Sequence, residues 1–153
     1  TECLHIMRAE KGFIMIGDET DGTVIPQDLG LSWAISKKKD DFLGKRAQQR
    51  SFMDNPDRWQ LVGLETLDGS VLEDGAYAIA EGTNANGQFN TQGRVTSTYY
   101  SPTLGRGIAM GLVHKGPDRM GEVISLTKIG ASPVPAKIVS PVFYDPEGEK
   151  ANV

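Results

Sequence analysis

Glu10 is the residue whose type and position best fit ligand chemistry. It follows a short apolar segment and precedes Gly12, a junction at which a carboxylate can point away from the core into a cleft. Arg8 and Lys11 flank it and favour its ionised form. An ionised carboxylate accepts a pair of parallel N–H donors from a flat heterocycle or a guanidinium. The alternative is a surface ion pair worth little free energy, and the spacing by itself favours that alternative.

Two further charged segments could bind ions. The loop at 18–23 carries Asp18, Glu19 and Asp21, which are hard oxygen ligands for a cation. It lacks the glutamate that completes a helix–loop–helix calcium site, so we interpret it as a solvated turn. The three lysines at 37–39 form a solvated face or, alternatively, hold an anionic ligand.

Signatures of catalysis are nearly absent. His5 and His114 are far apart and lack partners at metal-ligand spacing, so a metal site is not expected. The sequence contains no phosphate-binding loop and no nucleophile elbow. We therefore assign no catalytic residue, and the residues by themselves indicate a ligand-binding or packing module of a larger enzyme.

The composition narrows the class of protein. The 153 residues suffice for one domain, or for a small domain and part of another. With 39% hydrophobic and 24% charged residues, a packed core is expected. The net charge of -4 argues against nucleic-acid binding. No apolar run is long enough to span a membrane, so neither nucleic acid nor membrane is an expected partner.

Cys3 and Thr1 indicate the cellular location of the protein and the extent of the chain. A single cysteine excludes an internal disulfide and favours a reducing, cytoplasmic location. Its apolar neighbour Leu4 favours a buried, inert thiol. Because the chain starts at Thr1 with ordered-looking sequence, we expect a fragment of a longer polypeptide.

The first 55 residues are expected to mix helices and strands. Residues 3–9 predict a short helix that places Leu4 and Met7 on one face, exposes His5 and ends at Gly12. Pro26 opens a helical turn that ends at Gly30. The expected strands are 13–16 and 33–36, and a helix is expected at 42–53 with Asp41 as its N-cap. A break at 54–57 marks a domain boundary.

The remaining residues predict a barrel. Short β-type segments recur at near-regular spacing, and Asn84–Gly87 carries a hairpin signal. Such a series without a long helix is typical of a small antiparallel barrel. The segments are 59–65, 77–80, 93–100, 108–113, 123–129 and 136–139.

Several motifs together resemble the aminomethyltransferase family, which comprises the T-protein of the glycine cleavage system and its relatives. They lie at 4–12, 26–33, 41–45 and 100–111, and so run through almost the whole chain. Within the family, residues 8–14 together with 18–26 are most similar to the alpha subunit of heterotetrameric sarcosine oxidases, and residues 141–146 are similar to the tails of sarcosine and dimethylglycine oxidising enzymes. The resemblance implies an α+β fragment, 1–55, from the end of the folate-binding domain, followed by an all-β small antiparallel barrel, 56–153.

The resemblance also implies an activity. Sarcosine oxidases oxidatively demethylate sarcosine to glycine, form hydrogen peroxide and pass the one-carbon unit to tetrahydrofolate. Their FAD, FMN and NAD lie in other domains and subunits, so the expected partners are folate and the other subunits of a hetero-oligomer, and this chain alone is expected to be inactive. The alternatives are an aminomethyltransferase of the glycine cleavage system and a folate-binding relative with an assembly role.

Three folate-binding residues follow from the same resemblance. Glu10 matches the family glutamate that holds the pterin ring. Lys39 matches a basic residue that lines the folate site, with Lys37 and Lys38 left open as alternatives. Tyr144 matches a tyrosine that contacts folate. The aspartate that assists methylene transfer in the family lies upstream of this chain.

Overall fold

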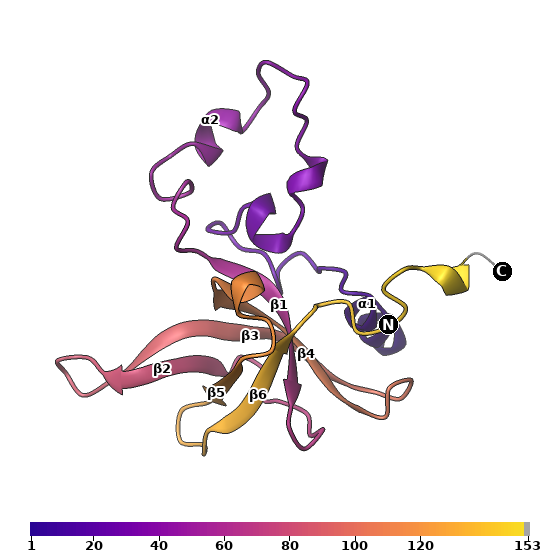
Figure 1. Cartoon of the computed structure of the whole chain (residues 1–153), viewed down its shortest axis with the longest axis vertical. Helices are drawn as coiled ribbons and strands as arrows, with labels where there is room; N and C mark the ends of the chain where they lie inside the picture. Colours follow the sequence, from indigo (N-terminus) through magenta and orange to yellow (C-terminus); the bar gives the residue numbers. More distant parts are fainter. Residues whose placement is uncertain (152–153) are drawn as a thin grey trace.

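Six antiparallel strands close into a barrel in the computed structural model, which describes residues 1–151 (Figure 1). Around the barrel the strands follow the order β1-β4-β3-β2-β5-β6, so that β1 pairs with both β4 and β6. The barrel predicted for the second half of the chain is confirmed. Its strands are β1 (Trp59–Thr66), β2 (Tyr77–Thr83), β3 (Phe89–Ser101), β4 (Arg106–His114), β5 (Val123–Thr127) and β6 (Val134–Val139).

Alternating side chains give the barrel two apolar faces. On β4, Ala109 and Val113 belong to a buried cluster to which all six strands contribute, which is the barrel interior. Met110 and Leu112 point the other way and belong to a second buried cluster on the outside, beneath the N-terminal segment. This outer cluster comprises Ala9, Leu29, Leu61, Ile108, Met110 and Leu112.

The N-terminal segment is helical and irregular. It contains α1 (Glu2–Glu10), the 3-10 helices η1 (Pro26–Leu29) and η2 (Ser32–Ala34), and α2 (Lys45–Gln48). The predicted helix at 3–9 and the helical turn opened by Pro26 are confirmed, and Gly30 ends that turn with a φ of 71°. Two further 3-10 helices, η3 (Gly116–Arg119) and η4 (Glu149–Ala151), follow β4 and β6.

The two strands predicted in this segment are wrong. Residues 13–16 form no strand, and residues 33–36 lie within and after η2. Ile16 is 82% exposed and Trp33 is 80% exposed, so neither apolar run is buried. A strand needs a neighbour to bond its backbone, and a closed barrel offers no free edge to these segments.

The helix predicted at 42–53 shrinks to the single turn of α2. Gly44 precedes α2 instead of lying inside a helix, and the apolar side chains Leu43 and Phe52 are exposed. A short helix takes most of its stability from packing an apolar face, and α2 contains no buried residue.

The burial expected for α1 is also wrong. Cys3 is exposed instead of buried, and His5 is only partly exposed, while the face that carries Leu4 and Met7 is exposed. The helix instead buries its last turn, which contacts β3 and β4. None of the helices within residues 1–151 is long and apolar enough to cross a membrane.

Candidate functional site

Glu10 ends α1 in a buried position, with only 5% of the residue exposed. The Ser101 hydroxyl donates a hydrogen bond of 2.5 Å to Glu10 Oε1. The backbone oxygen of Glu10 accepts the N–H groups of Phe143 and Tyr144, each at 2.9 Å. The residue thus joins the end of a helix, the end of β3 and the segment that follows β6.

The flanking cations do not pair with Glu10. Arg8 pairs with Asp18 and Glu19, and Lys11 pairs with Asp145. Within residues 1–151 no ion pair includes the Glu10 carboxylate, so the surface ion pair considered from the sequence is absent. The open cleft expected around Glu10 is replaced by a site that is nearly closed in this chain.

A C-terminal strap, defined here as residues 140–146, crosses the end of α1. Lys11 Nζ donates to the Asp145 backbone oxygen at 2.5 Å and lies 3.3 Å from Oδ2. Burial raises the pKa of Asp145, but its bonds from Lys11 and from the backbone of Lys150 outweigh burial and leave that pKa lowered. The strap also contains Tyr144, whose hydroxyl accepts a 2.7 Å bond from Lys150. The structure therefore brings Glu10 and Tyr144 together.

The predicted lysines lie elsewhere. Lys37, Lys38 and Lys39 are all exposed, in a stretch between η2 and α2 without helix or strand. This stretch runs across the top of the view, away from α1 and the C-terminal strap (Figure 1). The role of Lys39 in a folate site therefore stays a prediction, because this chain alone does not bring Lys39 close to Glu10 and the C-terminal strap (Figure 1).

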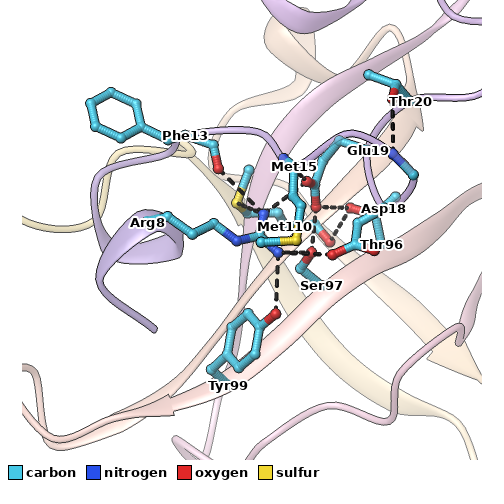
Figure 2. Close-up of polar contacts among 11 residues, drawn as sticks. Arg8, Phe13, Met15, Asp18, Glu19, Thr20, Thr96, Ser97, Tyr99 and Met110 are labelled. Carbon is cyan, nitrogen blue, oxygen red and sulfur yellow. Dashed lines mark hydrogen bonds and ion pairs between the residues drawn. The ribbon is translucent and has the colours of Figure 1, made fainter. Parts of the chain in front are cut away.

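A buried network surrounds Arg8, the residue two positions before Glu10 (Figure 2). Its guanidinium donates to Glu19 Oε2 at 2.8 Å, to Ser97 Oγ at 2.6 Å and to the Tyr99 hydroxyl at 3.2 Å. Asp18 accepts a further bond at 3.2 Å. We call this set of contacts the Arg8–Glu19 network.

Glu19 corrects the interpretation of its loop as a solvated turn. It is fully buried, and its carboxylate also accepts the backbone N–H of Met15 at 2.8 Å and the hydroxyls of Thr96 and Ser97. This burial could not be predicted from the sequence, because its partners Thr96 and Ser97 on β3 lie far along the chain. Asp21 in the same loop is exposed, and its bonds from Thr23 and Arg94 lower its pKa.

A second ion pair holds the N-terminal segment at the start of β1. Arg58 donates to both carboxylate oxygens of Asp28, with Nη2 at 2.6 Å from Oδ2. Asp28 is 3% exposed, and its hydrogen bonds raise the pKa of Arg58. A cavity of about 340 Å³ adjoins this pair, and the residues that line it include Asp21, Arg94 and Leu112 but none of the predicted folate-binding residues.

Similar proteins identify this architecture. Residues 60–145 match the family described as the glycine cleavage T-protein C-terminal barrel domain. The sarcosine oxidase alpha subunit of Corynebacterium sp. (strain P-1) is 42% identical over 152 residues, which are 98% of this chain and 16% of that subunit. The corresponding subunit of Rhizobium meliloti is 40% identical over 99% of this chain and 15% of its own length.

Aminomethyltransferases are similar as well. The enzyme of Thermosipho melanesiensis is 33% identical over 90% of this chain and 35% of its own length. The crystal structure of the glycine cleavage system aminomethyltransferase T from Bartonella henselae superposes with a TM-score of 0.72 at 25% identity. That comparison covers 91% of this chain and 37% of the solved chain.

The fold and site thus define a class of protein. Its members are closed six-stranded barrels that carry a helical segment on their outer face. The chain belongs to the glycine cleavage T-protein family, and its barrel is the C-terminal barrel domain of that family. It is homologous to the region of about 152 residues that it matches in the sarcosine oxidase alpha subunits. The family resemblance of the sequence motifs is confirmed.

Proposed function

We propose that this chain is the C-terminal folate-binding region of the alpha subunit of a sarcosine oxidase. The parent enzyme would demethylate sarcosine to glycine with formation of hydrogen peroxide, in a complex with other subunits. Tetrahydrofolate would accept the one-carbon unit. Flavin and nicotinamide cofactors would lie elsewhere in the parent enzyme, and this chain alone would be inactive.

The environment of Glu10 is the observation that carries the proposal. The carboxylate is nearly buried, pairs with no cation among the described residues, and receives a single side-chain hydrogen bond, from Ser101. A carboxylate has about four acceptor sites, so Ser101 leaves most of them unused. Among the described residues, Arg8 Nε is the buried side-chain polar atom without a partner, so the unbonded oxygen of Glu10 keeps access to solvent and to an incoming donor. The amino group and the adjacent ring N–H of a pterin are a donor pair of the required kind.

The neighbourhood of Tyr144 supports the same proposal. Its backbone N–H bonds to Glu10, so a ligand at the Glu10 carboxylate would lie near the C-terminal strap. Lys39, or Lys37 or Lys38 in its place, would contribute only if other parts of the parent enzyme bring the ligand's anionic tail toward that loop.

A stand-alone aminomethyltransferase is the second candidate. It is favoured by the matched aminomethyltransferases, which are shorter, so that this chain covers 35% of the Thermosipho melanesiensis enzyme. The higher identity over nearly the whole chain favours the oxidase. Flavin absorbance and peroxide production by the purified parent protein distinguish the two candidates, because only the oxidase would contain flavin and form peroxide.

The test is Glu10→Gln in the full-length parent protein. Glutamine keeps the size of glutamate but presents an amide donor to the pterin's own donors. Losing a hydrogen bond to a charged group costs roughly 1.5–3 kcal/mol, so tetrahydrofolate affinity should fall about tenfold or more. Amine oxidation should continue, because flavin chemistry would lie elsewhere. Calorimetric titration with tetrahydrofolate and a peroxide assay measure the two effects.

The matched control is Glu81→Gln. Glu81 is exposed on β2, so the same chemical change there should leave tetrahydrofolate affinity unaltered. Equal affinities of the Glu10→Gln variant and the unmodified protein would remove the basis for folate binding through Glu10.

A further inference from the structure

We infer that Ser101 is a positioning residue for the proposed folate site, because its hydroxyl fixes the carboxylate of Glu10 in the orientation that receives the pterin. This inference rests on the proposed function. It assigns a role to a residue on β3 that lies 91 positions from Glu10 in the sequence.

The direction of the Ser101 hydroxyl is determined by its two bonds. Oγ accepts the backbone N–H of Leu104 at 3.0 Å. The single hydroxyl proton then points to Glu10 Oε1, at 2.5 Å. Ser101 is fully buried, so water does not compete for either bond.

The backbone on both sides of this hydrogen bond is held in place. Ser101 is the last residue of β3, faces Arg106 on β4, and accepts the N–H of Gly105 at 2.8 Å within the connecting turn. On the other side, the C-terminal strap donates two backbone bonds to the Glu10 oxygen. The Ser101 bond is the one that determines where the side chain of Glu10 points.

A neutral donor at this position preserves the charge that a ligand needs. Were Arg8 to pair with Glu10, its guanidinium would occupy the bidentate face of the carboxylate. Arg8 is instead engaged by Glu19, Asp18 and Ser97. Ser101 takes one acceptor site and leaves the others, so the geometry suits a planar ligand with two adjacent N–H donors.

The experiment is a double-mutant cycle in the full-length parent protein, with tetrahydrofolate affinity measured by calorimetry. Ser101→Ala should weaken binding about fivefold to tenfold when Glu10 is present, the size expected for one lost hydrogen bond. In the Glu10→Gln background, the same change should alter affinity by less than about twofold, because the carboxylate that Ser101 positions is gone. Ser101→Thr keeps the hydroxyl and should retain affinity.

The control is Thr66→Val. Thr66 is also largely buried, and its hydroxyl donates to the Ser70 backbone oxygen at 2.7 Å and is not bonded to Glu10. Its removal should lower the melting temperature and leave folate affinity unchanged. Should the Thr variant fail to fold, the cycle with Ala decides the question without it.

Three results would overturn the inference. Unchanged affinity of Ser101→Ala, alongside weakened binding by Glu10→Gln, would remove the role of Ser101 and leave the proposed function intact. Additive effects of the two substitutions would show that Ser101 acts on general stability. Unchanged affinity of Glu10→Gln would remove the proposed function, and this inference with it.

Discussion

Arg8 and Glu10 are two residues apart and have opposite charges, yet each has a different partner. Arg8 binds the fully buried Glu19, whereas Glu10 receives a neutral hydroxyl from Ser101. The carboxylate of Glu19 is neutralised by Arg8 and saturated with hydrogen bonds, whereas the carboxylate of Glu10 retains unused acceptor sites. We therefore expect Glu19 to serve stability and Glu10 to serve binding.

Glu19→Gln tests the stability role. The change leaves the buried Arg8 guanidinium facing the partly exposed Asp18 as its remaining counter-charge. Breaking one side of a buried ion pair costs roughly 3–5 kcal/mol, and the free energy of unfolding from urea denaturation should fall by about that amount.

Glu122→Gln is the matched control for that experiment. Glu122 pairs with Arg119 at the surface, where its side chain is 47% exposed, and the loss there should be roughly 0.2–1 kcal/mol. Losses of similar size at the two positions would mean that burial adds nothing to the Arg8–Glu19 pair.

At the scale of single residues, only part of the site could be predicted from the sequence. The resemblance selected Glu10 and Tyr144, which the structure places together, and Lys39, which it places in a separate exposed loop. Ser101 was missed, because a serine far along the chain carries no local signal of its partner. Its partner becomes visible only when the β3–β4 turn and the end of α1 are placed in space.

The elements that assemble the site are the end of α1 and the C-terminal strap. Gly12 lets them approach, because an added Cβ would lie 2.7 Å from the Pro141 backbone oxygen. Gly63 on β1 provides room for the other side of the strap, since its Cβ would meet Ser140 and Phe143. The strap is thus seated between a helix end and a strand by two residues that lack side chains.

Gly12→Ala tests this seating, with Gly30→Ala as the matched control. Both glycines have a φ of 71°, but nothing lies within 4 Å of a Cβ at Gly30. Gly30→Ala should cost only the left-handed backbone conformation, roughly 1–2 kcal/mol. Gly12→Ala should cost a further 1–3 kcal/mol or so from overpacking against the strap. Urea denaturation of both variants measures the difference, and equal losses would contradict close packing at Gly12.

At the scale of elements, the strands could be predicted where the segment that forms the backbone hydrogen bonds of a strand is its neighbour in the sequence. The strands of the barrel alternate and are joined by turns with clear residue signals, such as Asn84–Gly87 between β2 and β3. The apolar runs at 13–16 and 33–36 have the composition of strands but no strand to pair with. These two wrong predictions show that strand formation depends on a partner segment. The periodicity of one segment does not reveal whether such a partner exists.

On the scale of the whole molecule, the N-terminal segment combines firm anchors with uncovered apolar side chains. Residues 1–30 are joined to the barrel by the Arg8–Glu19 network, by Glu10 and by the Asp28–Arg58 pair. Exposed large apolar side chains in the first 55 residues include Phe13, Ile16, Trp33, Leu43 and Phe52, and others are exposed on the barrel.

This distribution of anchors predicts the outcome of limited proteolysis. The sequence suggested a boundary between 1–55 and 56–153, and we expect trypsin to cut in the mostly exposed and irregular stretch from Lys37 to Arg50 while the barrel resists. The anchors of residues 1–30 should persist after the cut. The two pieces should therefore separate on a denaturing gel but elute together from a size-exclusion column, and part only in urea. Separation without denaturant would contradict the anchoring role of Arg8, Glu10 and Asp28, and early cuts within 60–140 would contradict a barrel that is the stable unit of this chain.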